Sequence, residues 1–270
     1  MEGLHRLVGF GDHVYVATSR RYLTLSTVVL DGQGGALVVD PAWDEDELAA
    51  IPADLLALGL VAVAGLATHV HYDHVLWHPD LGTVPRWTSP WTAKAVVDHR
   101  DEVLRPLLGD LPDELLGLAA RLEPLPDRAT APPTYVVPWS GPELLCHQHD
   151  AHAPAHIAVE IVAARVLLAG DMLSDAELPM PDDRDMTLEP YLAGLDLLAP
   201  IVARVDLLVP GHGTPTYEPV ARLDADRRYL DAVLSGRRVD DARLGYPDMA
   251  ELHEANLRRA RGEPALGEPV

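Results

Sequence analysis

Short hydrophobic runs in the first third of the chain alternate with turns and one amphipathic stretch. The strand-like runs, rich in Val and Leu, cover residues 13–19, 23–31, 36–40 and 63–69. Between the third and fourth runs, residues 44–60 carry acidic positions followed by leucines and predict a helix. Pro52 predicts a break or kink in this helix, because proline lacks the amide hydrogen that a helix interior uses. This strand–helix–strand order predicts helices packed against a sheet.

The pattern changes over residues 77–133. Two helix-like stretches within this segment cover roughly residues 92–108 and 113–122. A proline-rich passage follows them. We interpret the segment as an excursion between two halves of one domain, on the substrate side. Its tryptophans, Trp77, Trp87 and Trp91, either form an apolar wall over a site or pack the excursion's own small core.

Short apolar strands resume after the excursion, and helices follow them. The strand-like runs cover residues 142–148, 157–171 and 205–213, and the helix-like stretches cover 188–205, 217–236 and 247–262. Gly236 is expected to end the first of the two last helices. Because strands and helices alternate almost throughout, we expect one α/β domain over residues 1–270, with C-terminal helices over 217–270.

Composition narrows the possible partners. The chain has 270 residues, 48 % of them hydrophobic, and a mean hydropathy of +0.02, which is typical of a globular protein. Its longest apolar run, residues 55–67, is shorter than the roughly 20 residues of a membrane helix, and we see no signal peptide. A net charge of −21, with Lys94 as the sole lysine, opposes nucleic-acid binding. Cys146 is the single cysteine, so intrachain disulfides are excluded.

We expect a cytoplasmic protein with a small-molecule substrate and no nucleic-acid or membrane partner; the oligomeric state stays open.

The sequence THVHYDH over residues 68–74 places three histidines and an aspartate within six positions. On an extended strand or tight loop, residues two apart point the same way. We therefore expect His69, His71 and Asp73 to converge, with His74 pointing elsewhere. Imidazole and carboxylate groups are the ligands expected for zinc, with iron or manganese possible. The segment predicts two histidine ligands at one metal ion, and Asp73 with His74 at a second.

Two metal ions need further ligands, and later strand ends supply candidates. These candidates are His147, His149, His152 and His156 before one strand, Asp171 after another, and His212 on a Pro-Gly-His-Gly turn. A carboxylate such as Asp171 at a strand terminus could bridge two ions. Folds of the α/β class usually build their sites at strand ends. A binuclear metal site is therefore favoured over a set of ordinary polar turn residues.

Taken together, these segments resemble the metallo-β-lactamase superfamily. The motifs that carry the resemblance are T-H-x-H-x-D-H at 68–74, H-x-P-x-H at 152–156, G-D at 170–171 and P-G-H-G at 210–213. Asp40, which ends the strand-like LVVD, matches an aspartate that the family places before its first metal motif. The resemblance covers about residues 10–215. It implies an α/β fold of the four-layer αβ/βα sandwich type, with the metal ions in a cleft at one edge of two sheets.

The resemblance also implies a ligand set for two zinc ions, with iron or manganese as other possibilities. The implied ligands are His69, His71 and His152 for the first metal, Asp73, His74 and His212 for the second, and Asp171 as the bridge between them.

Two further residues are expected to support the ligands. Asp40 would accept a hydrogen bond that orients a ligand such as His69, and His156 matches the second histidine of the glyoxalase-like form of the motif. The family usually has glycines around the histidine that corresponds to His152, where this chain has alanines. His149 is the alternative ligand if that loop is remodelled.

The implied reaction is hydrolysis. Two zinc ions lower the pKa of a shared water from 15.7 toward about 7, and the resulting hydroxide would attack an ester, thioester, lactone or amide carbonyl of a small molecule. Asp73 is the expected catalytic residue, which orients the hydroxide and takes up its proton. Tyr72, Trp77 and His78 are candidates to line the substrate.

Other members of the superfamily supply the alternatives. An aspartate at position 171 is unlike the true β-lactamases, and the chain shows no basic cluster of the kind that grips glutathione in glyoxalase II-like thioesterases. Lactonases share the expected ligands. A mononuclear-iron persulfide dioxygenase-like oxidoreductase and a phosphodiesterase of the same fold remain the alternative functions.

Overall fold

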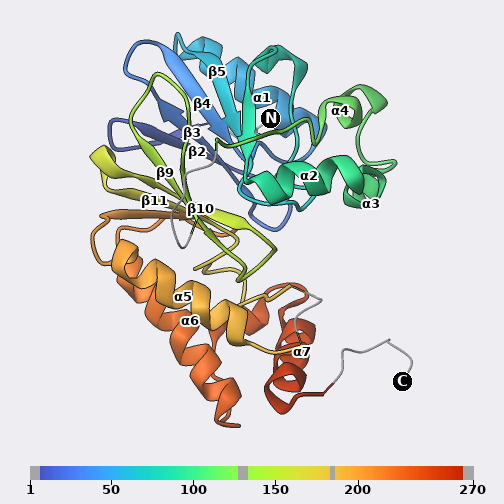
Figure 1. Cartoon of the computed structure of the whole chain (residues 1–270), viewed down its shortest axis with the longest axis vertical. Helices are drawn as coiled ribbons and strands as arrows, with labels where there is room; N and C mark the ends of the chain where they lie inside the picture. The colour runs from blue at the N-terminus through green and yellow to red at the C-terminus, as the bar shows by residue number, and fades with distance from the viewer. Residues whose placement is uncertain (1–6, 127–132, 183–185, 264–270) are drawn as a thin grey trace.

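Two β-sheets lie at the centre of the protein, and helices cover the outer face of each (Figure 1). The computed structural model describes residues 7–126, 133–182 and 186–263. Residues 1–6 at the start of the N-terminal segment, residues 127–132 of the predicted proline-rich passage, and residues 264–270 of the predicted C-terminal helical segment lie outside the described residues.

The first sheet has seven strands, which follow one another in sequence order. They are β1 (Val8–Phe10), β2 (Val14–Thr18), β3 (Leu25–Leu30), β4 (Gly35–Val39), β5 (Val61–Leu66), β6 (Arg86–Thr88) and β7 (Glu123–Pro124). Strands β1 to β4 are antiparallel, and β4 to β7 are parallel. Because β6 and β7 come from the 77–133 segment, part of that segment extends this sheet.

The second sheet has five strands in the order β12-β11-β10-β9-β8. They are β8 (Thr134–Val136), β9 (Leu144–His149), β10 (His156–Ile161), β11 (Val166–Gly170) and β12 (Leu207–Pro210). Only β11 and β12 among these are parallel. Each sheet therefore combines parallel and antiparallel strands, and most of the residues discussed below follow parallel strands.

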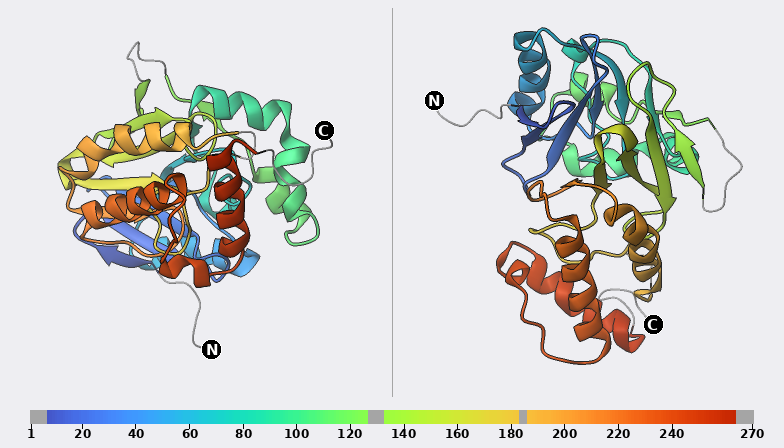
Figure 2. Two further views of the ribbon diagram at one scale, coloured as in Figure 1. Left: turned by 90° about the horizontal axis from the view of Figure 1, so that it is seen from below. Right: turned by 90° about the vertical axis from the view of Figure 1, so that its left-hand side faces the viewer.

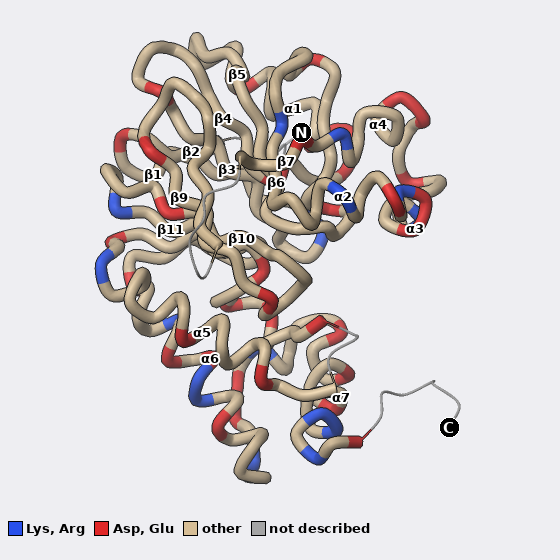
Figure 3. Tube along the Cα trace, in the orientation of Figure 1, with Lys and Arg blue, Asp and Glu red and all other residues tan. Residues whose placement is uncertain are grey.

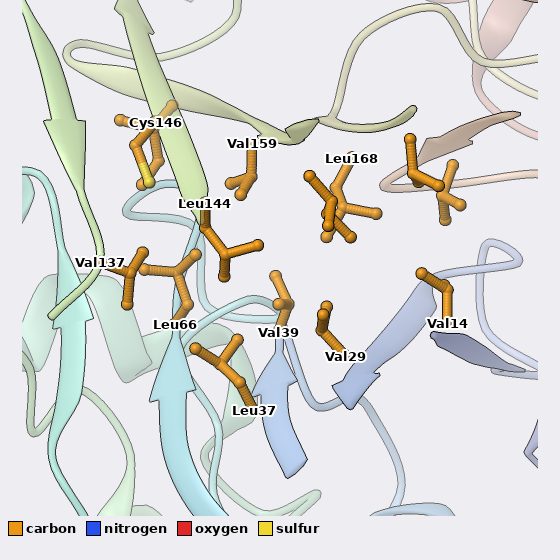
Figure 4. Packing of buried hydrophobic residues seen from close by; sticks show 14 of the residues in the cluster. Val14, Val29, Leu37, Val39, Leu66, Val137, Leu144, Cys146, Val159 and Leu168 are labelled. Atoms are coloured by element: carbon orange, nitrogen blue, oxygen red, sulfur yellow. The ribbon is translucent and has the colours of Figure 1, made fainter. Parts of the chain in front are cut away.

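Side chains alternate between the two faces of each strand, as a period of two residues requires. In β4, Leu37 and Val39 point into the core between the sheets, whereas Ala36 and Val38 face the helices outside. In β11, Leu168 lies in the core between the sheets and Leu167 faces outward. Figure 4 shows valines and leucines of both sheets meeting in that central core.

The helices complete the outer layers. They are α1 (Glu45–Ala57), α2 (Pro90–Asp98), α3 (Arg100–Leu104), α4 (Asp113–Leu118), α5 (Glu189–Val202), α6 (Pro219–Leu234) and α7 (Met249–Arg261), with 3₁₀ turns η1 (Pro79–Leu81), η2 (Arg105–Leu107), η3 (Val162–Ala164) and η4 (Ala242–Gly245). Helices α1 to α4 pack on the first sheet and α5 to α7 on the side of the second (Figures 1 and 2). The predicted αβ/βα layering is confirmed.

Helix α1 differs from its prediction, because it continues through Pro52 without a break. Leu48, Ile51 and Leu55 are buried on one of its faces. Their burial against the first sheet offsets the loss of one backbone hydrogen bond at the proline. The predicted helix over 92–108 is divided into α2, α3 and the turn η2.

The three tryptophans of the 77–133 segment occupy different places. Trp77 is buried beneath helices α1 to α4, where its indole nitrogen donates to the carbonyl of Gly82 (3.0 Å). Trp87 is buried in the core between the sheets. Trp91 lies in the first turn of α2 and is 41 % exposed. Trp77 and Trp87 therefore pack against the first sheet on its opposite faces.

Among the described residues, no helix is long and apolar enough to cross a membrane.

Candidate metal centre

The predicted metal-ligand residues meet at one edge of the paired sheets. Each follows the end of a strand: the turn after β5 carries His69 to His74, the β9–β10 turn carries His152, and β11 and β12 are followed by Asp171 and His212. The carboxyl ends of parallel strands lie at the same edge of a sheet, which brings residues from both sheets together here.

Three histidines form the first group, together with Asp171. His71 Nδ1 lies 3.0 Å from His69 Nε2 and 3.0 Å from His152 Nε2. Asp171 Oδ2 lies 3.4 Å from His69 Nε2 and 3.3 Å from His152 Nε2. His69 and His152 are almost fully buried, so water does not separate these polar atoms from one another.

Hydrogen bonds on the far side of each ring fix which nitrogen faces this group. The Thr68 hydroxyl gives its hydrogen to a carboxylate and therefore accepts from His69 Nδ1 (3.0 Å). His152 Nδ1 donates to the carbonyl of Met180 (2.9 Å). Both rings thus turn a bare Nε2 lone pair to His71, which can donate to only one of them. At least one of these two lone pairs therefore has no hydrogen atom to accept from His71, and a donor set of this kind fits a cation.

Asp73, His74 and His212 form the second group. Asp73 Oδ2 lies 3.4 Å from His74 Nε2 and 3.3 Å from His212 Nε2. Asp171 reaches both histidines, with Oδ1 3.2 Å from His74 Nε2 and Oδ2 3.4 Å from His212 Nε2. His74 Nε2 and Asp171 Oδ1 are buried, and within the described residues neither has a hydrogen bond of acceptable geometry. Buried polar atoms of this kind also fit a cation.

The position of His74 differs from its prediction. We expected it to point away from His69 and His71, but its ring lies 4.2 Å from that of His69, centroid to centroid. The segment is a turn rather than an extended strand, and the His74 amide donates to the carbonyl of His71 (3.1 Å). Because the chain bends back, the adjacent Asp73 and His74 both face the centre.

Asp40 has the predicted role of orienting a ligand, but the histidine that it contacts is His74 rather than His69. Its Oδ2 lies 3.0 Å from His74 Nδ1, and its two oxygens accept from the amide and hydroxyl of Thr68 (2.8 and 2.7 Å). Asp40 reaches His69 only through the Thr68 hydroxyl. A single buried carboxylate therefore sets the orientation of two histidines.

His156 supports Asp171 from behind. Its Nε2 accepts from the Asp171 backbone amide (3.2 Å), and its ring is stacked between those of His69 and His149. A Cβ at Gly170, where φ is +56°, would overlap the His156 ring. The structure places His149 beyond His156, outside both groups of candidate ligands in the described part of the chain. His152, rather than His149, thus faces the centre.

The remaining histidine of this region lies away from the centre. His147 Nε2 contacts Glu160 Oε2 (2.9 Å) on the neighbouring strand β10. It is one of the candidate residues that the structure does not bring to the site.

Burial and neighbouring charge shift the pKa values of the ligand side chains in different directions. Although burial opposes it, Asp171 raises the pKa of His74 and of His212 well above the ordinary value. Burial lowers the pKa of His69 well below its ordinary value and lowers the pKa of His71 to about 4, so both imidazoles are neutral at pH 7. Burial opposes ionisation of Asp73 and Asp171, but His74, His212 and the other histidines around each carboxylate together outweigh it. The pKa of each carboxyl therefore lies well below its ordinary value. Neutral imidazole and ionised carboxylate are the forms that bind metals.

Glu177 is a site residue that the sequence analysis missed. Its Oε1 lies 3.6 Å from His212 Nδ1, and it forms a third group of candidate ligands with Asp171 and His212. Burial raises the pKa of Glu177 to about 7. It lies in an irregular loop after β11, and no motif marks it in the sequence.

The three candidate substrate residues have different environments. Tyr72 is half-buried, and its ring meets that of Trp43 edge-on at 5.2 Å. Trp43 is in turn 5.8 Å from the ring of Tyr22. Trp77 packs beneath the helices, as described above, and His78 caps the turn η1 by accepting from the amide of Asp80 (3.2 Å). Tyr72 is therefore the one of the three that belongs to an aromatic row beside the centre.

Comparison with known proteins indicates the family and the fold of the chain. A family model described as the metallo-beta-lactamase superfamily matches residues 21–230. No curated protein matches the chain. Among solved structures, a metallo-beta-lactamase from Pontibacter korlensis has 16 % sequence identity and a TM-score of 0.56, covering 82 % of this chain and 95 % of its own.

Two further solved structures show the same likeness. The DIM-1 metallo-beta-lactamase has 14 % identity and a TM-score of 0.60 over 84 % of this chain and 96 % of its own. A double mutant of the sec-alkyl sulfatase PisA1 has 16 % identity and a TM-score of 0.63 over 86 % of this chain, which spans 42 % of the sulfatase. At these identities the likeness shows the fold alone. Because the family model covers most of the sequence and the fold agrees, the chain belongs to the metallo-beta-lactamase superfamily.

Proposed function

We propose that the protein is a metal-dependent hydrolase that cleaves an ester, thioester, lactone or amide bond of a small molecule at a centre of two divalent cations. One observation carries the proposal: two groups of buried ligand atoms lie side by side, and Asp171 contacts members of both. A carboxylate between two sets of nitrogen ligands is the arrangement expected for a bridged pair of metals.

The two groups divide the ligands as the sequence motifs implied. The first cation would be held by His69, His71 and His152, the second by Asp73, His74 and His212, and both by Asp171. Zinc suits these nitrogen and oxygen ligands, and iron or manganese would also fit. When bound, the cations supply Lewis acidity toward the carbonyl oxygen and make a water molecule acidic near neutral pH.

The chain's own residues then orient the reactants. Asp73 turns Oδ2 to His74 and His212, so we assign to its other oxygen the hydrogen bond that orients the attacking water and accepts its proton. The carboxylate is almost fully buried, and burial strengthens such a hydrogen bond. Asp40 holds the His74 ring in place during the reaction.

The alternatives make different demands on the ligands. A mononuclear-iron oxygenase needs only two histidines and one carboxylate, whereas this chain brings seven ligand side chains together. A phosphodiesterase of the same fold would accept a more anionic substrate, which the net charge of −21 disfavours. These observations favour carbonyl hydrolysis.

A panel of activated esters, thioesters, lactones, β-lactams and phosphodiesters, assayed with and without a chelator, tests the proposal. We expect hydrolysis of one or more carbonyl substrates that stops with chelator and returns with zinc. Hydrolysis of phosphodiesters alone, or oxygen consumption with a persulfide, would replace the proposal by one of the two alternatives.

A further inference from the structure

A cavity of about 560 Å³ lies beside the His212 end of the metal centre. Its walls come from three separate segments: residues 20–23 between β2 and β3, residues 176–177 after β11, and Tyr246, Pro247 and Met249 from the end of η4 to the first residue of α7. This volume lies within the range of roughly 300–1,000 Å³ that is typical of small-molecule sites. Residues 246–249 lie beyond the part of the chain that the family model matches.

The cavity walls are connected directly to the metal centre. The carbonyl of Tyr22 accepts from His212 Nδ1 (3.0 Å), and the carbonyl of Leu23 accepts from the amide of Gly213 (3.0 Å). A second wall of the cavity also reaches this ring, because Glu177 Oε1 lies 3.6 Å from His212 Nδ1. Two lining residues, Tyr22 and Glu177, therefore contact the ring that carries one of the proposed ligand nitrogens.

The lining is largely apolar and includes two exposed aromatic rings. Tyr22 is 50 % exposed and Tyr246 is 43 % exposed, although both are large side chains that folding would normally bury. Leu23, Pro247 and Met249 contribute further apolar surface. Such walls favour an alkyl or aryl group, because each methylene removed from water contributes about 0.8 kcal/mol.

The positive charges in the lining are already paired. Arg20 binds Asp46 (2.6 Å), and Arg21 binds both Asp44 (2.7 Å) and Asp110 (2.6 Å). Neither guanidinium is therefore available as a clamp for a carboxylate or phosphate. Acidic residues also outnumber basic ones along the chain, 42 to 21 (Figure 3). Both facts disfavour an anionic group in the cavity.

A buried arginine fixes the wall that the C-terminal segment contributes. Arg243 donates to the carbonyls of Ser174 (3.1 Å) and Glu177 (3.1 Å) and also binds Asp226. The Ser174 hydroxyl donates to the carbonyl of His212 (2.8 Å). Since these bonds connect η4 to the metal-binding loops, residues 246–249 hold a fixed position relative to the centre.

We propose that this cavity is the specificity pocket of the enzyme and that it takes an uncharged alkyl or aryl part of the substrate, with Tyr246 and Tyr22 as opposite walls. This inference rests on the proposed hydrolase function. It places substrate selection in the 20–23 loop and in the residues around the start of α7, because none of the described lining residues lies in the 77–133 segment.

Ester series that share one leaving group test the pocket. For p-nitrophenyl hexanoate against acetate, we expect the wild-type protein to have a kcat/KM ratio of at least about ten, from burial of the additional methylenes. The adipate monoester, equal in length but anionic, should react at least about tenfold more slowly than the hexanoate. Tyr246→Ala and Tyr22→Ala should each reduce the hexanoate-to-acetate ratio by about threefold or more.

The matched control is Tyr217→Ala, which makes the same change at a 65 % exposed tyrosine outside the cavity. It should leave the ratio unchanged. An unchanged hexanoate-to-acetate ratio in both cavity variants would refute the proposal that this cavity selects the substrate. Turnover of the adipate monoester equal to that of the hexanoate would also refute it.

A binding measurement separates this inference from the proposed function. Calorimetric titration of metal-loaded protein with hexanohydroxamate and acetohydroxamate requires no turnover. We expect tighter binding of the longer chain in the wild type and a smaller difference in Tyr246→Ala. If no ester is hydrolysed, the hydrolase proposal fails, and this titration still decides the pocket: equal affinity for both hydroxamates in the wild type would refute it.

Discussion

The orientation of each imidazole depends on the atom that its outer nitrogen contacts. His152 donates to the carbonyl of Met180 and His212 to the carbonyl of Tyr22, so both turn Nε2 to the centre, whereas His71 turns Nδ1. The sequence predicted these histidines as ligands but could not predict the facing nitrogen. The partner atoms are backbone carbonyls of remote residues, which no side-chain motif records.

Removal of one ligand from either group should remove about one metal ion. His71→Ala takes a nitrogen from the first group and His212→Ala takes one from the second. We expect each variant to lose roughly one metal equivalent and all measurable turnover, because three-ligand groups leave few donors to compensate. Metal analysis and activity on the substrate found in the panel provide the measurements.

The control for these variants is His99→Ala, at an exposed histidine that belongs to neither group. It should keep its metal content and activity. Wild-type turnover in His71→Ala or His212→Ala would show that the assignment of the centre is wrong.

Asp73→Asn tests the proton acceptor. The amide keeps the shape of the side chain but cannot accept a proton, so the fold should remain and the rate should decrease by at least about 10²-fold. Circular dichroism and kcat measured on metal-loaded protein distinguish these effects. A near-normal rate would mean that Asp73 serves only to shape the turn.

Among the elements, the turn after β5 shows what sequence periodicity could not describe. Alternation of side chains along a strand or tight loop predicted the convergence of His69 and His71, but it placed His74 on the wrong side because the chain bends back at this turn. The same limit applies to Pro52, which a local rule treats as a helix breaker, although burial of the α1 face keeps the helix continuous. Tertiary packing decided both outcomes.

The turn after β12 requires a glycine at position 211. A Cβ there would overlap Asp171 Oδ1, so Gly211→Ala should push the bridging carboxylate out of place. We expect weaker binding of both metals, by at least about tenfold, measured by competition with a chromophoric chelator. Gly117→Ala, in α4 with open space around it, is the matched control and should bind metal normally. Normal metal affinity in Gly211→Ala would contradict the bridging position of Asp171.

Strand β10 carries a pH-dependent contribution to stability. Glu160 binds Arg204 (2.6 Å), and this hydrogen bond lowers the pKa of the carboxyl. A lowered pKa in the folded state stabilises the protein above the unfolded pKa of about 4.3, and the contribution is lost as pH falls through the folded value. Glu160→Gln should therefore lower the free energy of unfolding at pH 7 by about 1 kcal/mol, a modest amount because Arg204 is half-exposed and screened by solvent.

Urea denaturation at pH 7 and pH 4 measures this effect. The difference in the free energy of unfolding between Glu160→Gln and the wild type should be smaller at pH 4. Glu251→Gln, on the exposed side of α7, should have the same free energy of unfolding as the wild type at both pH values. An equal difference at both pH values would mean that the ion pair does not carry the effect.

In the molecule as a whole, the resemblance carried by the metal motifs implied the αβ/βα layering, whereas the alternation of strand-like and helix-like segments predicted only helices packed against a sheet. The cavity was not predictable. Its walls come from segments more than two hundred residues apart, and only the packing of η4 against the 174–177 loop brings them together. Glu177 escaped prediction for the same reason.

The proposed centre also connects the two sheets. His69 to His74 follow the first sheet, and His152, Asp171 and His212 follow the second, so each group of ligands includes side chains from both. A cation in either group would hold the two halves of the sandwich together at this edge. Metal binding and stability should therefore be coupled.

The central claim is that this edge of the sandwich binds two metal ions. Metal content of the protein purified without added metal, determined by inductively coupled plasma mass spectrometry alongside the His71→Ala and His212→Ala variants, tests it most directly. We predict about two zinc ions per chain in the wild type and about one in each variant. A single iron per chain in the wild type, or two metal ions retained in both variants, would contradict the claim.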